Sequence, residues 1–168
     1  SPGDVNFALP NQPSNAGDAL KFHDPRPEQL TTVQRNWLVN YLTEFETNLY
    51  GANWRDPVNG YTKYVDVDSF VDAHWIVEFP KQIDGYRLSN YMYKDRNGKI
   101  NMEPIWDWNL SFGNANYLDG GLTNGWYYPL ISEQQHIWLR RIMTGSSPGS
   151  SRPGDPEFLQ KIADRWGE

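Results

Sequence analysis

Aromatic side chains are the feature of this chain that most limits how it can fold. The 168 residues include eight Trp, ten Tyr and seven Phe, and they include no Cys. Disulfides, thiolate nucleophiles and zinc sites with Cys ligands are therefore excluded. Large rings can fill a dense core or form exposed platforms that stack on sugars or bases. We expect most of these rings in the core of a single domain.

The charge balance excludes two further classes of protein. Fifteen Lys and Arg stand against 21 Asp and Glu, which gives a net charge of −6, and no run of like charge occurs. A nucleic-acid-binding protein needs a basic face to neutralise phosphates, so we expect no nucleic-acid partner. Apolar stretches such as Trp75-Ile76-Val77 are far shorter than the roughly 20 residues that cross a bilayer, so no membrane span is predicted.

Helix-breaking residues near the start of the chain, and apolar residues at helical spacing after them, divide the chain into an arm and a domain. Prolines among Asn, Gly and Asp predict an extended arm over residues 1–30, and residues 31–168 are expected to form the domain. Thr31 or Thr32 is expected to cap the first helix and Asp68 the second. Apolar residues at helical spacing predict helices over 31–50, 68–79 and 133–143, and a last helix that opens at Asp155-Pro156.

A β-hairpin is predicted between the second and third helices. Residues 88–94 and 100–106 are rich in Tyr, Ile and Met, and the Asp95-Arg96-Asn97-Gly98 segment between them is typical of a hairpin turn. The predicted fold class is α+β, mainly helical, with this central hairpin and long irregular loops. Trp37, Trp75, Trp106 and Trp138 are expected inside.

Two carboxylates flank the hairpin in the order found in protein kinases. Asp84 precedes the first strand, and Asp107 follows the second. In a kinase, one Asp accepts the proton of the substrate hydroxyl, a hairpin follows, and a second Asp holds the metal that bridges the phosphates. The alternative is structural: Asp84 caps a turn and Asp107 closes a strand end.

Three segments, in the same order, resemble the spore-coat CotH kinase family in its C-terminal portion. They are YVDVDSFVD (64–72), DGYRLSNYMYKD (84–95) and PIWDWNLSFG (104–113). The resemblance implies a kinase-like C-lobe from an atypical protein kinase that is extracellular, on the cell surface or in the spore coat. Such an enzyme transfers phosphate from ATP to Ser residues of extracellular or coat proteins and uses Mg²⁺ or Mn²⁺.

Carried over residue by residue, the resemblance assigns the site. Asp84 becomes the catalytic carboxylate and Asp107 the metal ligand. Asn109 stands where many family members carry a second acid, and it is a neutral oxygen ligand. Asn90 is a further candidate ligand. Because adjacent strand residues face opposite ways, only one of Ser89 and Asn90 can point at the site.

Two further residues are assigned to the cofactor. Lys81 lies three residues before Asp84, where its ammonium group could neutralise a phosphate of ATP, although a solvated Lys is an equal alternative. Trp106 directly precedes the metal-binding Asp107 and is expected beside the bound nucleotide.

The nucleotide-covering half of a kinase is missing from the sequence. Residues 1–60 contain neither a Gly-rich loop after a strand nor a suitable strand Lys. We therefore expect a fragment that is inactive alone and whose partner is the missing N-terminal half of the same protein. Two other functions remain open. One is a non-catalytic structural protein of the coat or surface, and the other is a carbohydrate-binding or adhesion module that uses Trp108, Tyr117, Trp126, Tyr127 and Tyr128.

Overall fold

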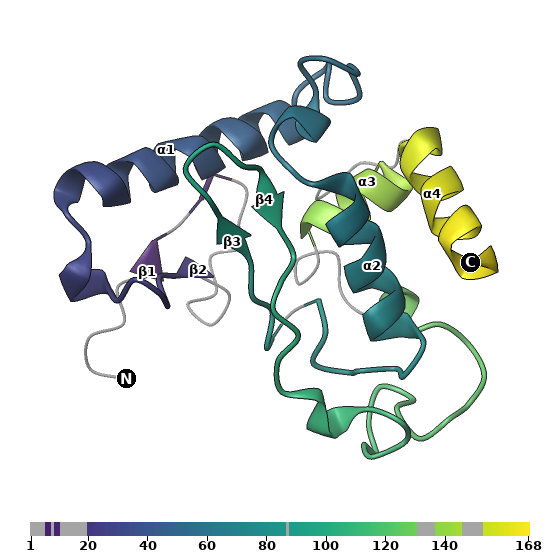
Figure 1. The fold of residues 1–168 in the computed structure, drawn as a ribbon. Helices are drawn as coiled ribbons and strands as arrows, with labels where there is room; N and C mark the ends of the chain where they lie inside the picture. Colours follow the sequence, from purple (N-terminus) through teal and green to yellow (C-terminus); the bar gives the residue numbers. More distant parts are fainter. Residues whose placement is uncertain (1–5, 8, 11–19, 87, 131–136, 146–152) are drawn as a thin grey trace.

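The computed structural model describes residues 6–7, 9–10, 20–86, 88–130, 137–145 and 153–168 (Figure 1). Its helices and strands combine in an α+β fold, as the sequence predicts. They are β1 (Asn6–Phe7), β2 (Leu20–Lys21), α1 (Thr32–Leu49), α2 (Val67–Glu78), β3 (Tyr93–Lys94), β4 (Ile100–Asn101), α3 (Ile137–Thr144) and α4 (Pro156–Gly167).

Side-chain caps fix where the helices begin. The Thr31 hydroxyl accepts from the backbone N–H of Gln34, and the Gln34 side chain accepts from the N–H of Thr31 in return. The Asp155 carboxylate accepts from the N–H of Glu157 at the start of α4. Thr31 is one of the two predicted caps of α1, and α4 begins at Asp155-Pro156 as predicted. The cap of α2 is Asp66 rather than the expected Asp68, so this helix begins earlier than its apolar pattern suggested.

The start of the third predicted helix, at residue 133, lies outside the described residues, and α3 is described from Ile137 onward. Within the predicted arm, β1 pairs antiparallel with β2, and Leu9 is buried in the core cluster of the domain. Within the described residues, every helix is too short or too polar to cross a bilayer.

The predicted hairpin exists, but its ladder is much shorter than expected. Tyr93 pairs with Asn101 and Lys94 with Ile100, around a turn in which the Gly98 N–H donates to the Asp95 carbonyl. The strands predicted over 88–94 and 100–106 are wrong beyond these residues. Ser89 has a left-handed φ of 51°, which breaks an extended strand, and Pro104 has no N–H to give to a ladder.

The core is built by the second half of α1, by α2 and by rings from the loops. Leu42, Phe45 and Leu49 are buried on α1, whereas Val33 and Trp37 on its first turns are exposed. The inward position predicted for Trp37 is therefore wrong. Instead, the Lys94 ammonium group of β3 makes cation–π contacts with the rings of Trp37 and Tyr41, at 4.9 and 4.5 Å from the ring centres. Figure 1 shows the hairpin reaching this part of α1.

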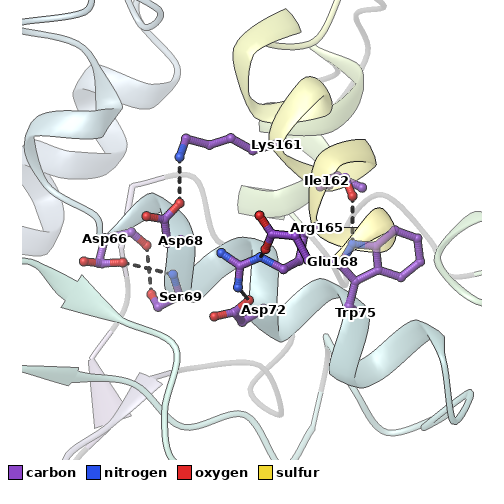
Figure 2. A network of polar contacts seen from close by, with 9 residues as sticks. All are labelled: Asp66, Asp68, Ser69, Asp72, Trp75, Lys161, Ile162, Arg165 and Glu168. Carbon is purple, nitrogen blue, oxygen red and sulfur yellow. Dashed lines mark hydrogen bonds and ion pairs between the residues drawn. The ribbon is translucent and has the colours of Figure 1, made fainter.

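Helix α4 lies beside α2 and is tied to it by one polar contact per turn (Figures 1 and 2). Lys161 pairs with Asp68 at 2.7 Å, Arg165 pairs with Asp72, and the Trp75 indole N–H donates to the Ile162 carbonyl at 2.9 Å. These contacts hold the face of α2 that lies against α4. Since the segment after α2 carries Asp84, they also fix the base on which the candidate site is built.

Three tryptophans from separate segments meet at the end of this helix pair. The Trp75 ring of α2 lies 4.7 Å from Trp166 of α4 and 5.6 Å from Trp126 of the loop before α3, measured between ring centres. Trp126 and Trp166 are 6.4 Å apart. We call these three residues the tryptophan cluster. Such tilted and edge-to-face pairs are favourable for aromatic rings.

Candidate functional site

The Asp84 turn begins directly where α2 ends. Pro80 cannot continue the helix, and the chain folds back on it, with the Gln82 N–H donating to the Val77 carbonyl at 2.9 Å. Asp84 is half-buried, and its neighbour Tyr86 has a left-handed φ of 71°. A non-glycine residue in this region stays there only when its surroundings hold it firmly. The turn is therefore a constrained part of the fold.

Asp107 occupies a second constrained turn. It has a left-handed φ of 64°, is exposed, and precedes a 3-10 turn over Trp108–Leu110. The Ser89 hydroxyl donates to its Oδ2 at 3.2 Å. With its amide nitrogen turned toward the carboxylate, Asn109 donates to Oδ1 at 2.9 Å. Two neighbours thus orient the Asp107 carboxylate.

Hydrogen bonds join the two turns to each other. The Gln82 side-chain amide donates to the Asp107 carbonyl at 2.7 Å, and the Ile83 N–H donates to the Leu110 carbonyl at 3.3 Å. The Phe112 N–H donates to the Pro80 carbonyl at 2.7 Å. The segments that carry Asp84 and Asp107 are 23 residues apart in sequence and lie against each other in the fold. The role of each carboxylate stays a prediction.

Ser89 and Asn90 both line a small cavity of about 30 Å³, together with Tyr91 and Trp108. Of these two neighbours, Ser89 is the one whose hydroxyl bonds to the Asp107 carboxylate. A cation held by Asp107, Asn109 and Asn90 would use one carboxylate and two amide oxygens, which are hard ligands suited to Mg²⁺ or Mn²⁺. To serve as such a ligand, Asn109 would have to turn its oxygen toward the cation in place of the NH₂ group that donates to Asp107. Among the described residues, no three His, Cys, Asp or Glu side chains cluster for a metal.

The contacts of Lys81 are those of a loop anchor. Its ammonium group is buried and donates to the carbonyls of Asp119, Leu122 and Asn124 at 3.4, 3.0 and 2.8 Å. An ammonium group has three N–H donors, so this set uses all of them. A phosphate would have to replace one of these carbonyls.

Trp106 lies on the surface rather than in the core, so its predicted inward position is wrong. Its side chain is 59% exposed, and its ring meets the edge of Tyr91 at 6.1 Å. The left-handed Asp107 that follows turns the chain immediately after it. A ring in this position is accessible to a ligand, and its assignment to the nucleotide stays a prediction.

A buried polar cluster behind the Asp84 turn was not predicted from the sequence. Glu78 Oε1 accepts from the Tyr86 hydroxyl at 2.8 Å and from the Tyr128 N–H at 2.9 Å, and its Oε2 accepts from the Tyr127 N–H at 2.7 Å. The Tyr86 hydroxyl also lies 2.9 Å from His74 Nδ1. The donors come from positions up to 50 residues away in sequence, and local patterns carry no signal for such pairs.

Electrostatics in this cluster follow from burial. Burial raises the pKa of Glu78, against the opposing effect of its three hydrogen-bond donors and of the Lys81 ammonium group. Burial also raises the pKa of Tyr86, and it lowers the pKa of His74 from 6.5 to about 4. His74 is therefore neutral at pH 7.

Gly85 allows the Asp84 turn to lie close to α2. A Cβ at this position would stand 2.5 and 2.7 Å from the two methyl groups of Val77, and 2.9 Å from the Gln82 carbonyl oxygen. We expect Gly85→Ala to lower the free energy of unfolding by about 1–3 kcal/mol, because the turn must move off the helix. In a Val77→Ala background, Gly85→Ala should cost less. Urea denaturation of the four proteins in this double-mutant cycle measures the difference.

The matched control is Gly98→Ala in the hairpin turn, where the nearest atom to an added Cβ is Asp95 Cβ at 3.4 Å, an ordinary contact. It should change stability by less than about 0.5 kcal/mol. Equal costs at Gly85 and Gly98, or a Gly85 cost unchanged by Val77→Ala, would refute the close-approach explanation.

Comparison with known proteins places this arrangement in a family. Residues 2–166 match the family model described as CotH kinase protein, so the chain belongs to that family. The match confirms the resemblance drawn from residues 64–72, 84–95 and 104–113. Searches of curated proteins and of solved structures gave no significant match.

Proposed function

We propose that this chain is the catalytic-lobe portion of a CotH-type protein kinase, which transfers the γ-phosphate of ATP to Ser residues of extracellular or spore-surface proteins. The observation that supports it best is the hydrogen-bonded junction of the Asp84 and Asp107 turns, in which Gln82 donates to the Asp107 carbonyl at 2.7 Å. Phosphoryl transfer needs two carboxylates held in a fixed relation, and the match to a family described as CotH kinase protein supports this reaction class.

In the proposed reaction, the Asp84 carboxylate accepts the proton of the Ser hydroxyl as its oxygen attacks the γ-phosphorus. A Ser O–P bond forms, the bond to the β,γ-bridging oxygen breaks, and ADP leaves. Asp107, with Asn109 and Asn90, would hold Mg²⁺ or Mn²⁺, which supplies positive charge next to the transferring phosphate. Ser89 keeps the Asp107 carboxylate oriented through its hydroxyl.

The proposal includes a nucleotide-covering half outside these residues, because residues 1–60 offer no Gly-rich loop after a strand, and their strand lysine, Lys21 of β2, lies in a strand of two residues. The test uses a longer protein that carries this half. It should transfer ³²P from γ-labelled ATP to its own Ser residues or to dephosphorylated casein, whereas residues 1–168 alone should not. Absence of transfer by the longer protein with either Mg²⁺ or Mn²⁺, or tight ATP binding by residues 1–168 alone, would count against it.

Metal binding can be tested on the present chain. One carboxylate and neutral amides provide little negative charge, so we expect Mn²⁺ to bind with a Kd on the order of millimolar. Asp107→Ala should abolish this binding in calorimetry, and Asp95→Ala in the hairpin turn should leave it unchanged. Binding that survives Asp107→Ala would place the cation elsewhere.

The sugar-binding alternative has narrower support. Of the loop aromatics that it invokes, Tyr117 and Trp126 are exposed. Tyr127 is buried, and the Trp108 indole N–H donates inward to the Ile76 carbonyl at 3.3 Å. A glycan-array signal that is lost in Trp126→Ala would favour this function over phosphate transfer.

A further inference from the structure

Glu78 is the last residue of α2 and one of the few buried carboxylates in the described part of the chain. Its side chain is 3% exposed, and both of its oxygens accept hydrogen bonds. A buried carboxylate is costly unless it is fully bonded, so its partners identify what the charge holds in place. Those partners are the Tyr86 hydroxyl and the backbone N–H groups of Tyr127 and Tyr128.

These partners act on both sides of Asp84. Tyr86 is two residues after Asp84 in the same turn. Tyr127 reaches the residue before Asp84, because its hydroxyl donates to the Ile83 carbonyl. The rings of Tyr86 and Tyr127 also stack, with centres 5.9 Å apart and planes inclined by 12°. One carboxylate therefore fixes the two aromatic residues that hold the chain before and after Asp84.

The hydrogen bonds at Glu78 require both of its side-chain oxygens to be acceptors. A carboxylate offers only acceptors, and here three donors converge on it. A glutamine has one oxygen and one NH₂ group, so at least one of the three donors would face another donor. The Tyr86 hydroxyl has a single proton. When it is given to Glu78, His74 Nδ1–H donates to the Tyr86 oxygen, which completes the cluster.

We propose that Glu78 is a positioning residue for the Asp84 carboxylate, acting through Tyr86 and Tyr127 without touching the substrate. The expected effect on turnover rests on the proposed kinase function, whereas the expected effect on the position of the Asp84 turn does not. Misplacement of a catalytic group by about 1 Å can cost on the order of a hundredfold in rate. Loss of the Glu78 charge should therefore reduce turnover and leave nucleotide binding largely intact.

The experiment compares Glu78→Gln with Glu46→Gln. Glu46 is also fully buried, and its Oε1 accepts from the Trp138 indole N–H at 2.7 Å, in the part of the core between α1 and α3. Both variants neutralise a buried glutamate, and only the first lies at the turn. The first readout is the ¹H–¹⁵N spectrum of residues 1–168. Glu78→Gln should shift the amides of Asp84, Gly85 and Tyr86, and Glu46→Gln should leave them in place.

The second readout is kinase turnover in the longer protein. Glu78→Gln should lower kcat about tenfold or more with the KM for ATP changed less than twofold, and Glu46→Gln should leave kcat within twofold. Tyr86→Phe, which keeps the stacked ring and removes only the hydroxyl, serves if Glu78→Gln does not fold. It should lower kcat about threefold or more.

The possible failures are separable. Equal effects of Glu78→Gln and Glu46→Gln on the spectrum and on kcat would overturn the positioning role, as would an unchanged kcat in Tyr86→Phe. If the amides of the turn shift only in Glu78→Gln but the longer wild-type protein transfers no phosphate, the proposed function fails and the link from Glu78 to the turn stands.

Discussion

Asp84→Asn should lower kcat for phosphate transfer by about a hundredfold to ten-thousandfold in the longer protein that carries the nucleotide-covering half. The amide keeps the size of the side chain but accepts a proton poorly, so the substrate hydroxyl is no longer deprotonated as it attacks. The KM for ATP should change little, because Asp84 is assigned to the attacking hydroxyl and not to the nucleotide. Initial rates over a range of ATP concentrations measure both constants.

Asp95→Asn is the control for that change. Asp95 lies in the hairpin turn between the two candidate residues and is exposed. Its substitution removes the same charge from the same region of the chain, and activity should stay within twofold. If the wild-type protein is active and Asp84→Asn lowers kcat no more than Asp95→Asn does, Asp84 is not the catalytic carboxylate.

Acid should destabilise the fold through His74. Burial lowers its pKa in the folded state from 6.5 to about 4. Above pH 6.5, both folded and unfolded states are neutral at this residue, and its contribution to stability is complete. As the pH falls from 6.5 toward 4, His74 becomes protonated in the unfolded state but stays neutral in the folded state. This residue alone should then lower the free energy of unfolding by about 3 kcal/mol across that interval.

His74→Asn tests this expectation. The Asn side-chain amide can still donate toward the Tyr86 hydroxyl, and it does not titrate in this range. Urea denaturation at several pH values should show a stability slope between pH 6.5 and 4 that is shallower in the variant than in the wild type. The variant is also less stable at pH 7 because the smaller side chain leaves a gap. Parallel slopes in the two proteins would show that His74 is not the group responsible.

Local chemistry accounts for what the sequence predicted correctly. Thr31 and Asp155 cap their helices because a side-chain oxygen next to the first turn has N–H groups within reach. The Asp95 to Gly98 turn closes a hairpin as its residue types indicate. In the site, the sequence predicted Asp84 and Asp107 as a pair on either side of that hairpin, and the segments that carry them are hydrogen-bonded.

What the sequence did not predict depends on contacts between distant residues. Val33, Trp37 and Phe79 continue helical apolar patterns but are exposed, because the described body of the domain does not cover those turns. The charged side chains of Glu46, Glu78 and Arg141 are buried because distant residues supply partners for them. The guanidinium group of Arg141 donates to the Leu49 carbonyl, 92 residues away, and lies 4.6 Å from the Trp54 ring centre. A charged residue can be buried there only because such partners exist, and periodicity contains no record of them.

The tryptophan cluster provides an optical signal for the docking of α4. Its three indoles come from α2, α4 and the loop between residues 117 and 127, with ring centres 4.7 to 6.4 Å apart. Indoles fixed at such distances give strong near-ultraviolet circular dichroism, which is lost when tertiary packing is lost even if helices persist. The near- and far-ultraviolet spectra of this protein therefore report two different events. The first follows the loss of aromatic packing, to which the separation of α4 from α2 contributes through the tryptophan cluster, and the second follows the melting of the helices themselves.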